Sequence, residues 1–228
     1  MPQNKRLSRF RCKGCAECCK DFGRPNILPL FEWEKELLQK NAKKNGLRLD
    51  IRPLEAIFDA KSGKVITLQY GMHNAPCPFL VHKRCQIYAK RPSVCRQFPI
   101  SFPKKELSLS EEVFFHCPNF DSESEFYKRF SKGKAKNERA YRKYLKKTYG
   151  SCYTVAWEVL QFQKKMEKKI DKLINQKKIK PKKIEEKDIK NKEERPILEF
   201  LVDLKEITKK ERELIINRFN PKRILAKP

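Results

Sequence analysis

The fold is decided near the N-terminus, where four thiols fall within eight positions in the stretch Cys12-Lys13-Gly14-Cys15-Ala16-Glu17-Cys18-Cys19. On a helix, at about 100° per residue, the four side chains project within one third of the circumference and converge on one side. A loop that turns into a helix at Gly14 is an equally good local structure. In either case, two residues between thiolates is a spacing with which neighbouring cysteines hold one metal ion at about 2.3 Å.

Metal is a better explanation of this stretch than disulfides or inert thiols. The four cysteines are too close together for most disulfides, whose α-carbons lie about 4.4–6.8 Å apart with suitable side-chain directions. Free cysteines behave as small apolar residues, whereas this segment is otherwise charged. The adjacent pair Cys18 and Cys19 is less usual, and it places one thiolate on each of two metals or leaves one thiolate free for chemistry.

A second set of cysteines lies downstream, each in a turn-like setting, at Cys77, Cys85, Cys95 and Cys117. Prolines adjacent to Cys77 and Cys117, and within four residues of Cys95, hold the chain in non-regular conformations, which suits rigid ligand loops. With the first four they make eight thiols, the number needed for two all-cysteine tetrahedral sites or two four-iron clusters. The ninth cysteine, Cys152, is expected to be an ordinary residue at the start of a helix.

The two sets together resemble a known family. The patterns are C-x-x-C-x-x-C-C at 12–19, C-x-F-L at 77–80, C-x-I-Y at 85–88 and R-P-x-x-C-R-x-F-P at 91–99. They resemble the CxxCxxCC family of proteins proposed to chelate zinc or iron, over roughly residues 10–120. One departure is Ala16, where the family usually has glycine, which weakens any claim that the position needs a positive φ angle but leaves the ligands intact. Flagellin lysine N-methylases carry a similar cysteine domain, so the resemblance implies a metal site and admits a protein lysine methyltransferase relative without specifying a reaction.

The sequence leans toward iron without deciding between an iron–sulfur cluster and zinc. Cys12, Cys15 and Cys18 follow the C-x-x-C-x-x-C run of bacterial ferredoxins, whose further cysteine precedes a proline, as Cys77 and Cys117 do. Against iron, the ferredoxin run places its next cysteine after three residues, whereas Cys19 follows directly. Mononuclear zinc sites take two separated pairs of ligands, and Cys12 with Cys15 fits one such pair.

Arginines near the cysteines are candidates for balancing the negative charge of a thiolate site. Arg91 and Arg96 flank Cys95, and Arg11 precedes Cys12, so their guanidinium groups are expected to donate hydrogen bonds to sulfur. The alternative is that all three are ordinary surface residues of a basic protein. The three histidines, His73, His82 and His116, are not assigned as ligands.

Composition limits the remaining classes of protein. The chain has 228 residues and only seven glycines, and no glycine-rich nucleotide-binding loop is present. No apolar run approaches the roughly 20 residues needed to span a bilayer, and no signal peptide is recognisable. We therefore expect a cytoplasmic protein without membrane contact, in a compartment where thiols stay reduced and available to metal.

Hydrophobic periodicity predicts an α+β fold. Helices are expected over 30–44, 137–148 and 155–173, and after the capping box Thr208-Lys209-Lys210-Glu211. Strands are expected over 65–70 and 107–115, with a shorter one near 86–88. We expect a cysteine-rich metal-binding domain over 1–120 and a basic helical extension over 121–228, with a lysine-rich linker near 177–195.

The net charge of +26 raises a second functional class. Lysines of the C-terminal half are interleaved with Tyr141, Tyr144, Tyr149 and Tyr153, a pattern that suits nucleic acid, although acidic proteins are equally available partners. A solvated lysine-rich surface is the simpler explanation. Two functions remain: a redox-active or catalytic metalloprotein, and a non-catalytic metal-folded module that binds RNA or DNA through basic helices. Whether the chain is an enzyme stays open.

Overall fold

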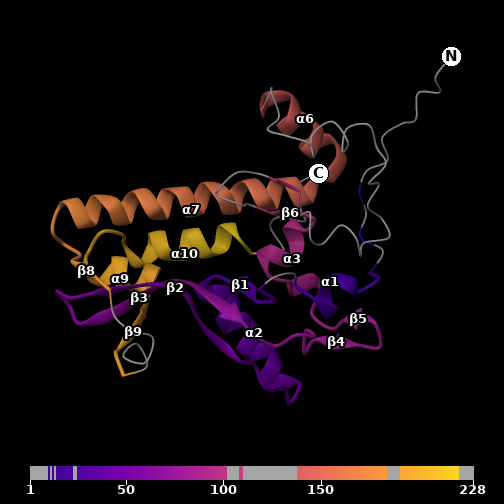
Figure 1. Ribbon diagram of the computed structural model, residues 1–228, viewed down its shortest axis with the longest axis horizontal. Helices are drawn as coiled ribbons and strands as arrows, with labels where there is room; N and C mark the ends of the chain where they lie inside the picture. The colour runs from indigo at the N-terminus through magenta and orange to yellow at the C-terminus, as the bar shows by residue number, and fades with distance from the viewer. Residues whose placement is uncertain are drawn as a thin grey trace.

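The computed structural model describes residues 10, 12, 14–22, 25–101, 108–109, 138–183 and 191–220. Helices and mainly antiparallel strands occur together, which confirms the predicted α+β class. No helix within these ranges is long and apolar enough to cross a membrane. In Figure 1 the sheet forms the centre, the long helix α7 lies along one side of it, and α2 lies on the other.

The central sheet has five strands. In the order in which they pair, the strands of the main path are β1 (Leu28–Leu30), β3 (Lys64–Met72), β2 (Ile51–Asp59) and β8 (Pro181–Lys182), and β9 (Glu194–Pro196) pairs with β3 in parallel. The strand expected over 65–70 is therefore confirmed and is longer. The hairpin between β2 and β3 turns at Gly63, whose φ is +71°. Asp59 stabilises this turn because its carboxylate accepts the backbone N–H groups of Lys61 and Ser62, both at 3.1 Å.

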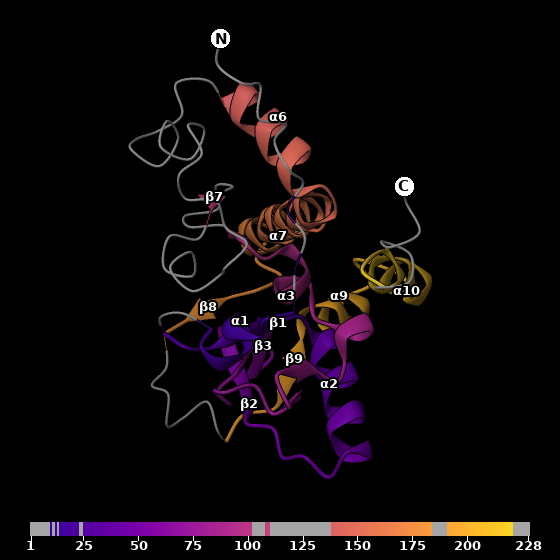
Figure 2. The same cartoon turned by 90° about the vertical axis from the view of Figure 1, so that its right-hand side faces the viewer.

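Two helices of the C-terminal half match their predictions closely. Helix α7 (Ser151–Asn175) buries the stripe that the sequence periodicity marked, including Val155, Val159, Met166 and Ile170. Helix α6 (Glu138–Tyr149) precedes it and packs against its start. Figure 2, turned by 90°, shows α7 nearly end-on above the sheet.

The last two helices close the core between α7 and the sheet. Helix α9 (Ile197–Asp203) buries Leu198 and Leu201 against Ile66 of β3 and Leu173 of α7. Helix α10 (Lys209–Arg218) begins with the expected capping box, in which Thr208 Oγ1 accepts the N–H of Glu211 at 3.1 Å. The residues near 177–195, expected to be a linker, include β8 and the first residues of β9. Segments on both sides of residue 120 thus share one sheet.

The N-terminal half carries the shorter elements around the cysteines. These are α1 (Glu17–Lys20), α2 (Glu32–Lys44), β4 (Leu80–Val81), β5 (Arg84–Cys85), a 3₁₀ turn (Tyr88–Lys90), α3 (Ser93–Gln97), β6 (Ile100–Ser101) and β7 (Ser108–Leu109). Helix α2 agrees with the helix expected over 30–44. The short strand expected near 86–88 is wrong by a few residues, because Gln86 and Ile87 lead into the 3₁₀ turn instead. Of the strand expected over 107–115, all but 108–109 lies outside the described residues.

Candidate metal centre

The C-x-x-C-x-x-C-C stretch turns through two left-handed residues. Gly14 has a φ of +69° and Ala16 a φ of 68° with a ψ of 5°. The turn at Ala16 leads into α1, and the N–H of Cys19 donates to the carbonyl of Ala16 at 2.9 Å. The alanine weakened the case for a positive φ at position 16, but the structure shows that the angle is positive all the same. The backbone keeps the conformation that favours glycine, and the alanine side chain bears the steric cost.

Backbone contacts hold the other cysteine segments against this turn. The N–H of Cys77 donates to the carbonyl of Cys19 at 2.7 Å, which joins the two sets of cysteines directly. Cys85 lies on β5 and pairs with Leu80 of β4. Cys95 lies on α3, whose first residue Ser93 donates its N–H to the Glu34 carboxylate of α2 at 2.6 Å. In Figure 1, α1, α3, β4 and β5 gather at one end of the molecule.

Six cysteines line one cavity of about 350 Å³ between these segments. They come from the N-terminal turn, the loop before β4, β5 and α3, and they are Cys12, Cys18, Cys19, Cys77, Cys85 and Cys95. The rest of the wall is largely apolar and includes Leu38, Met72, Phe79 and Ile87. The structure thus brings together six of the eight predicted ligands around one space.

The other two predicted ligands differ from these six. Cys15 is partly buried but does not line the cavity, and Cys117 lies outside the described residues. As the side chains stand, no group of three or more His, Cys, Asp or Glu in the described ranges is close enough to hold a metal ion. The six thiols therefore form a cage around a cavity and not a closed coordination sphere. Its donors are soft sulfur atoms on an apolar wall, which fit zinc or an iron–sulfur cluster.

The adjacent thiols of Cys18 and Cys19 share a hydrogen bond that shifts their pKa values in opposite directions. A hydrogen bond from Cys18 and, to a smaller extent, the charge of Arg91 outweigh the effect of burial and lower the pKa of Cys19 to about 7. The same hydrogen bond, together with burial, raises the pKa of Cys18. Burial also raises the pKa of Cys77 to about 11 and that of Cys95 well above its ordinary value. Cys19 is therefore the thiol of this group that ionises first, and a cation is needed to ionise the buried ones.

The two arginines that flank Cys95 have different roles. Arg91 lines the cavity, and its Nε donates a hydrogen bond to the backbone carbonyl of Tyr88 at 3.0 Å. The Cζ atom of its guanidinium group lies 3.6 Å from the centroid of the Tyr88 ring. Its positive charge favours the thiolate forms of Cys19 and Cys95. Arg96 instead donates from Nη2 to Ser93 Oγ at 3.1 Å and to the carbonyl of Phe219 at 2.9 Å.

Arg91, together with Arg84 of β5, therefore places positive charge at the wall of the cage, whereas Arg96 ties α3 to the C-terminal end of α10. Arg11 lies outside the described residues. Neither His73 nor His82 lines the cavity, and His116 also lies outside the described part of the chain.

Cys152 occupies the position expected for it, in the first turn of α7. It packs in a separate cluster with Tyr144, Leu145 and Ala156, and it does not line the cavity. Burial raises the pKa of its thiol to about 11. The ninth cysteine thus supplies a natural comparison for the six that face the cavity.

Comparison with known proteins agrees with this geometry. The family model CxxCxxCC, described as "Putative zinc- or iron-chelating domain", matches residues 11–133, which is more than half of the chain. No curated protein and no solved structure matches the chain. The match spans both sets of cysteines and every segment of the cavity wall that carries them. The chain therefore belongs to the CxxCxxCC family.

Proposed function

We propose that this chain is an iron–sulfur protein whose cluster is held by thiolates of the six-cysteine cavity. The observation that carries the proposal is the convergence of six thiols from four segments on one space of about 350 Å³. A mononuclear zinc site uses about four ligands and closes tightly around one ion. A larger, thiol-rich and otherwise apolar space suits a polynuclear centre better, and zinc held by the same thiols is the alternative.

The residues around the cavity fit such a cluster. A four-iron cluster with four thiolates carries net negative charge in its oxidised form, and Arg91 places a fixed positive charge at the wall. Phe79 and Ile87 are buried and keep water away from the sulfur atoms. Bound there, a cluster would supply one-electron transfer, which supports a function of the redox or catalytic class.

The same proposal gives different roles to the two halves of the chain. Residues 1–120 carry the metal, and the basic residues 121–228 support them through β8, which pairs with β2, and β9, which pairs with β3. The described tyrosines of this basic part do not support nucleic acid as its partner. Tyr144 and Tyr149 are buried, and Tyr153 stacks on Trp157 with ring centroids 6.4 Å apart, so these rings serve internal packing.

The test is anaerobic reconstitution with iron and sulfide, followed by iron and acid-labile sulfide analysis and an absorption spectrum. Cys77→Ser and Cys95→Ser should each lose most of the cluster, because each removes a thiol from the cavity wall. Cys152→Ser is the matched control, and it should keep iron and sulfide at the level of the parent. A colourless product with zinc bound and no labile sulfide would show that the metal is zinc. Full cluster content in both cavity variants would contradict the cavity assignment.

A further inference from the structure

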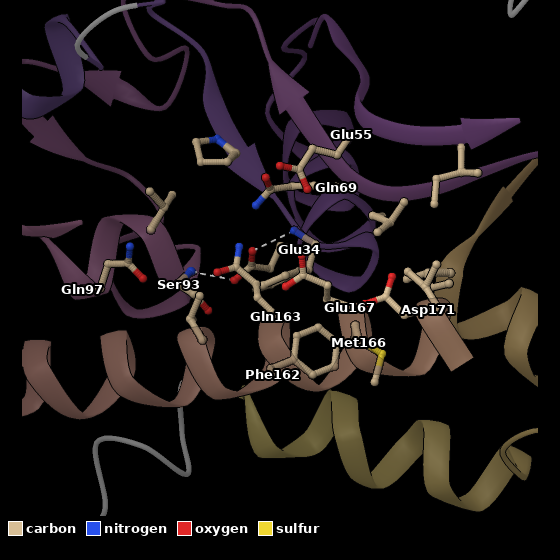
Figure 3. A pocket seen from close by; sticks show the side chains of 18 of the residues that line it. Glu34, Glu55, Gln69, Ser93, Gln97, Phe162, Gln163, Met166, Glu167 and Asp171 are labelled. Carbon is tan, nitrogen blue, oxygen red and sulfur yellow. Dashed lines mark hydrogen bonds between the residues drawn. The ribbon is translucent and has the colours of Figure 1, made fainter. Parts of the chain in front are cut away.

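A second cavity, of about 560 Å³, lies on the other side of α3 from the thiols. Its walls are the face of β2 and β3, the long helix α7 and the end of α3 (Figure 3). Its volume is within the range of about 300–1,000 Å³ that small-molecule sites occupy. The polar side chains that matter to its chemistry are Glu55, Gln69, Gln97, Gln163, Glu167 and Asp171. None of these was singled out by the sequence motifs.

The charge of this lining is opposite to that of the molecule. Among the described residues, every ionisable side chain that lines the cavity is a carboxylic acid, and neither lysine nor arginine contributes to its walls. The chain as a whole has 54 Lys and Arg against 28 Asp and Glu. An acidic pocket in so basic a protein concentrates cations at one place while the surrounding surface repels them. The charge pattern points to a positively charged ligand.

Helix α7 gives the cavity an elongated shape with two kinds of wall. Gln163, Glu167 and Asp171 recur every four residues and therefore form one line, with about 6 Å of rise at each step. Phe162, Met166 and Ile170 recur at the same interval and form an apolar line beside it. A linear molecule with an aliphatic stem and polar ends matches both lines at once.

The buried end of the cavity holds an acceptor without a donor. The Gln97 side chain is 6% exposed, and its Oε1 atom has no hydrogen-bond partner anywhere in the described chain. Buried acceptors are nearly always paired, because an unpaired one loses its hydration without compensation. Figure 3 shows Gln97 and Asp171 toward opposite ends of the cavity. The structure thus presents an acceptor for a ligand N–H at one end and a carboxylate at the other.

The environment of the individual carboxylates in the lining indicates which kind of cation fits the cavity. Glu34 is already used, since its carboxylate accepts the N–H groups of Ser93 at 2.6 Å and Phe31 at 3.1 Å. Glu55 and Asp171 are exposed at the mouth and form no ion pair within the described ranges. No three acids converge closely enough to hold a metal ion in that part of the chain. Dispersed carboxylates beside an apolar wall suit an organic ammonium ion better than a metal.

We propose that this cavity binds an elongated aliphatic diamine or polyamine. The ammonium groups of the bound amine contact the carboxylates of Glu55 and Asp171 at the mouth of the cavity and Gln97 Oε1 at its buried end. Its methylene stem lies on Phe162 and Met166. This site is separate from the thiol cavity and requires no metal.

The first test is calorimetric titration of the full-length, metal-loaded protein at low ionic strength with cadaverine and with spermidine. Pentanediol has the carbon chain of cadaverine without its charges and serves as the neutral comparison. Both amines should bind and the diol should not, since the diol offers no charge to the acidic lining. Because the protein is strongly positive, a bound amine reports a local site and not general attraction. Absence of heat with either amine at millimolar concentration would overturn the proposal.

Variants locate the site. The double variant Glu55→Gln, Asp171→Asn keeps the shape of the mouth and removes two charges, and it should weaken amine binding about tenfold or more. Gln97→Leu should weaken binding while raising the melting temperature slightly, because it removes an unpaired buried acceptor. Glu36→Gln removes one exposed acid of α2 outside the cavity and should leave the affinity unchanged. Equal affinity in the parent and the double variant would place the amine elsewhere and reject this cavity.

Discussion

The two cavities of this molecule are built in opposite ways. The thiol cavity is enclosed by turns and short elements, and half of its cysteines come from one stretch of eight residues. The amine cavity, as we call the space of about 560 Å³ proposed to bind an amine, lies mainly between the long elements β2, β3 and α7, and its polar residues come from these and from α3. The difference shows that the spacing of nearby residues in the sequence can predict a site formed by a few short segments. A site formed between helices and strands that are distant in the sequence has no such local motif.

The cores beside the two cavities differ in the same way. The core next to the thiols contains Leu30, Leu38, Tyr70 and Phe79, and it includes partly buried cysteines among its contacts. The core next to the amine cavity is formed mainly by apolar residues of α7, α9 and β3, and no cysteine is among its described members. We therefore expect the stability of the first core, but not that of the second, to depend on what the cysteines bind. Four experiments test that contrast.

Metal removal should have the largest effect. Chelation leaves the buried thiols without their cation, and metal binding is part of the folding free energy of such centres, so we expect a loss of several kcal/mol and a fall in Tm of roughly 10 °C or more. Hydrogen exchange should rise selectively around Cys77–Cys95, while α7 and β3 near Ile66 stay protected. Unchanged thermal unfolding after stoichiometric metal removal would contradict a structural role of the metal.

Truncation of one leucine in each core separates stability from metal binding. Leu38 and Leu198 are 1% and 0% exposed, so each substitution by alanine should cost about 2–5 kcal/mol of unfolding free energy. Only Leu38 lines the thiol cavity, and only Leu38→Ala should also speed the loss of metal to a chelator. Equal metal release from both variants would mean that the two cores are not independent.

A buried acid between the cores should make stability depend on pH. Burial raises the pKa of Glu32 to about 7, although Leu198 N–H and Arg212, each 3.1 Å from the carboxylate, lower it. Because the pKa of Glu32 is higher in the folded than in the unfolded chain, its contribution to the free energy of unfolding is fully present below a pH of about 4.5. That contribution is lost as the pH rises through about 7. The glutamine variant Glu32→Gln should remove that loss, a difference from the parent on the order of 2–3 kcal/mol across the window.

The measurement is the free energy of urea unfolding of the parent and the variant at several pH values within the window. Glu199→Gln is the matched control, because Glu199 also contacts Arg212, at 3.4 Å, but is 38% exposed. It should follow the parent. Parallel pH profiles of the parent and Glu32→Gln would show that Glu32 is ionised throughout.

Sequence patterns predicted the elements that carry strong local signals. The apolar stripe of α7 and the capping box of α10 are confirmed, because both depend on residues within a few positions of one another. Strand β2 was missed because Pro53 interrupts its pattern, and the structure accommodates that residue next to a register shift in the pairing with β3. Helix α9 and strand β9 were missed because elements distant in the sequence stabilise them: β9 pairs with β3, and α9 packs against β3 and α7.

The candidate site was predictable to the same extent. Cysteine positions follow from the sequence, but their sorting into six inside the cavity, with Cys15 beside it, depends on how four segments meet. The different roles of Arg91 and Arg96 were equally hidden, because only the fold brings Phe219 to Arg96. Gln97 carries no motif and became visible only as an unpaired atom in a cavity.

The smallest expected effect comes from the turn that presents the thiols. Ala16 has a φ of 68°, and an alanine in this conformation costs about 1–2 kcal/mol. Glycine removes that cost but gains freedom in the unfolded chain, worth roughly 0.5–1 kcal/mol. Ala16→Gly should therefore raise the unfolding free energy by at most about 1 kcal/mol, while metal content stays that of the parent.

Gly14 allows the reverse substitution, glycine to alanine, as a control. Its φ is +69°, and an added Cβ atom meets nothing within 4 Å, so Gly14→Ala tests backbone conformation without a steric clash. It should lower the unfolding free energy by about as much as Ala16→Gly raises it. If Ala16→Gly lowered stability instead, the alanine methyl group, which is buried, would contribute more through packing than its backbone costs. The pair of variants thus measures how much strain the metal-binding turn holds before any metal binds.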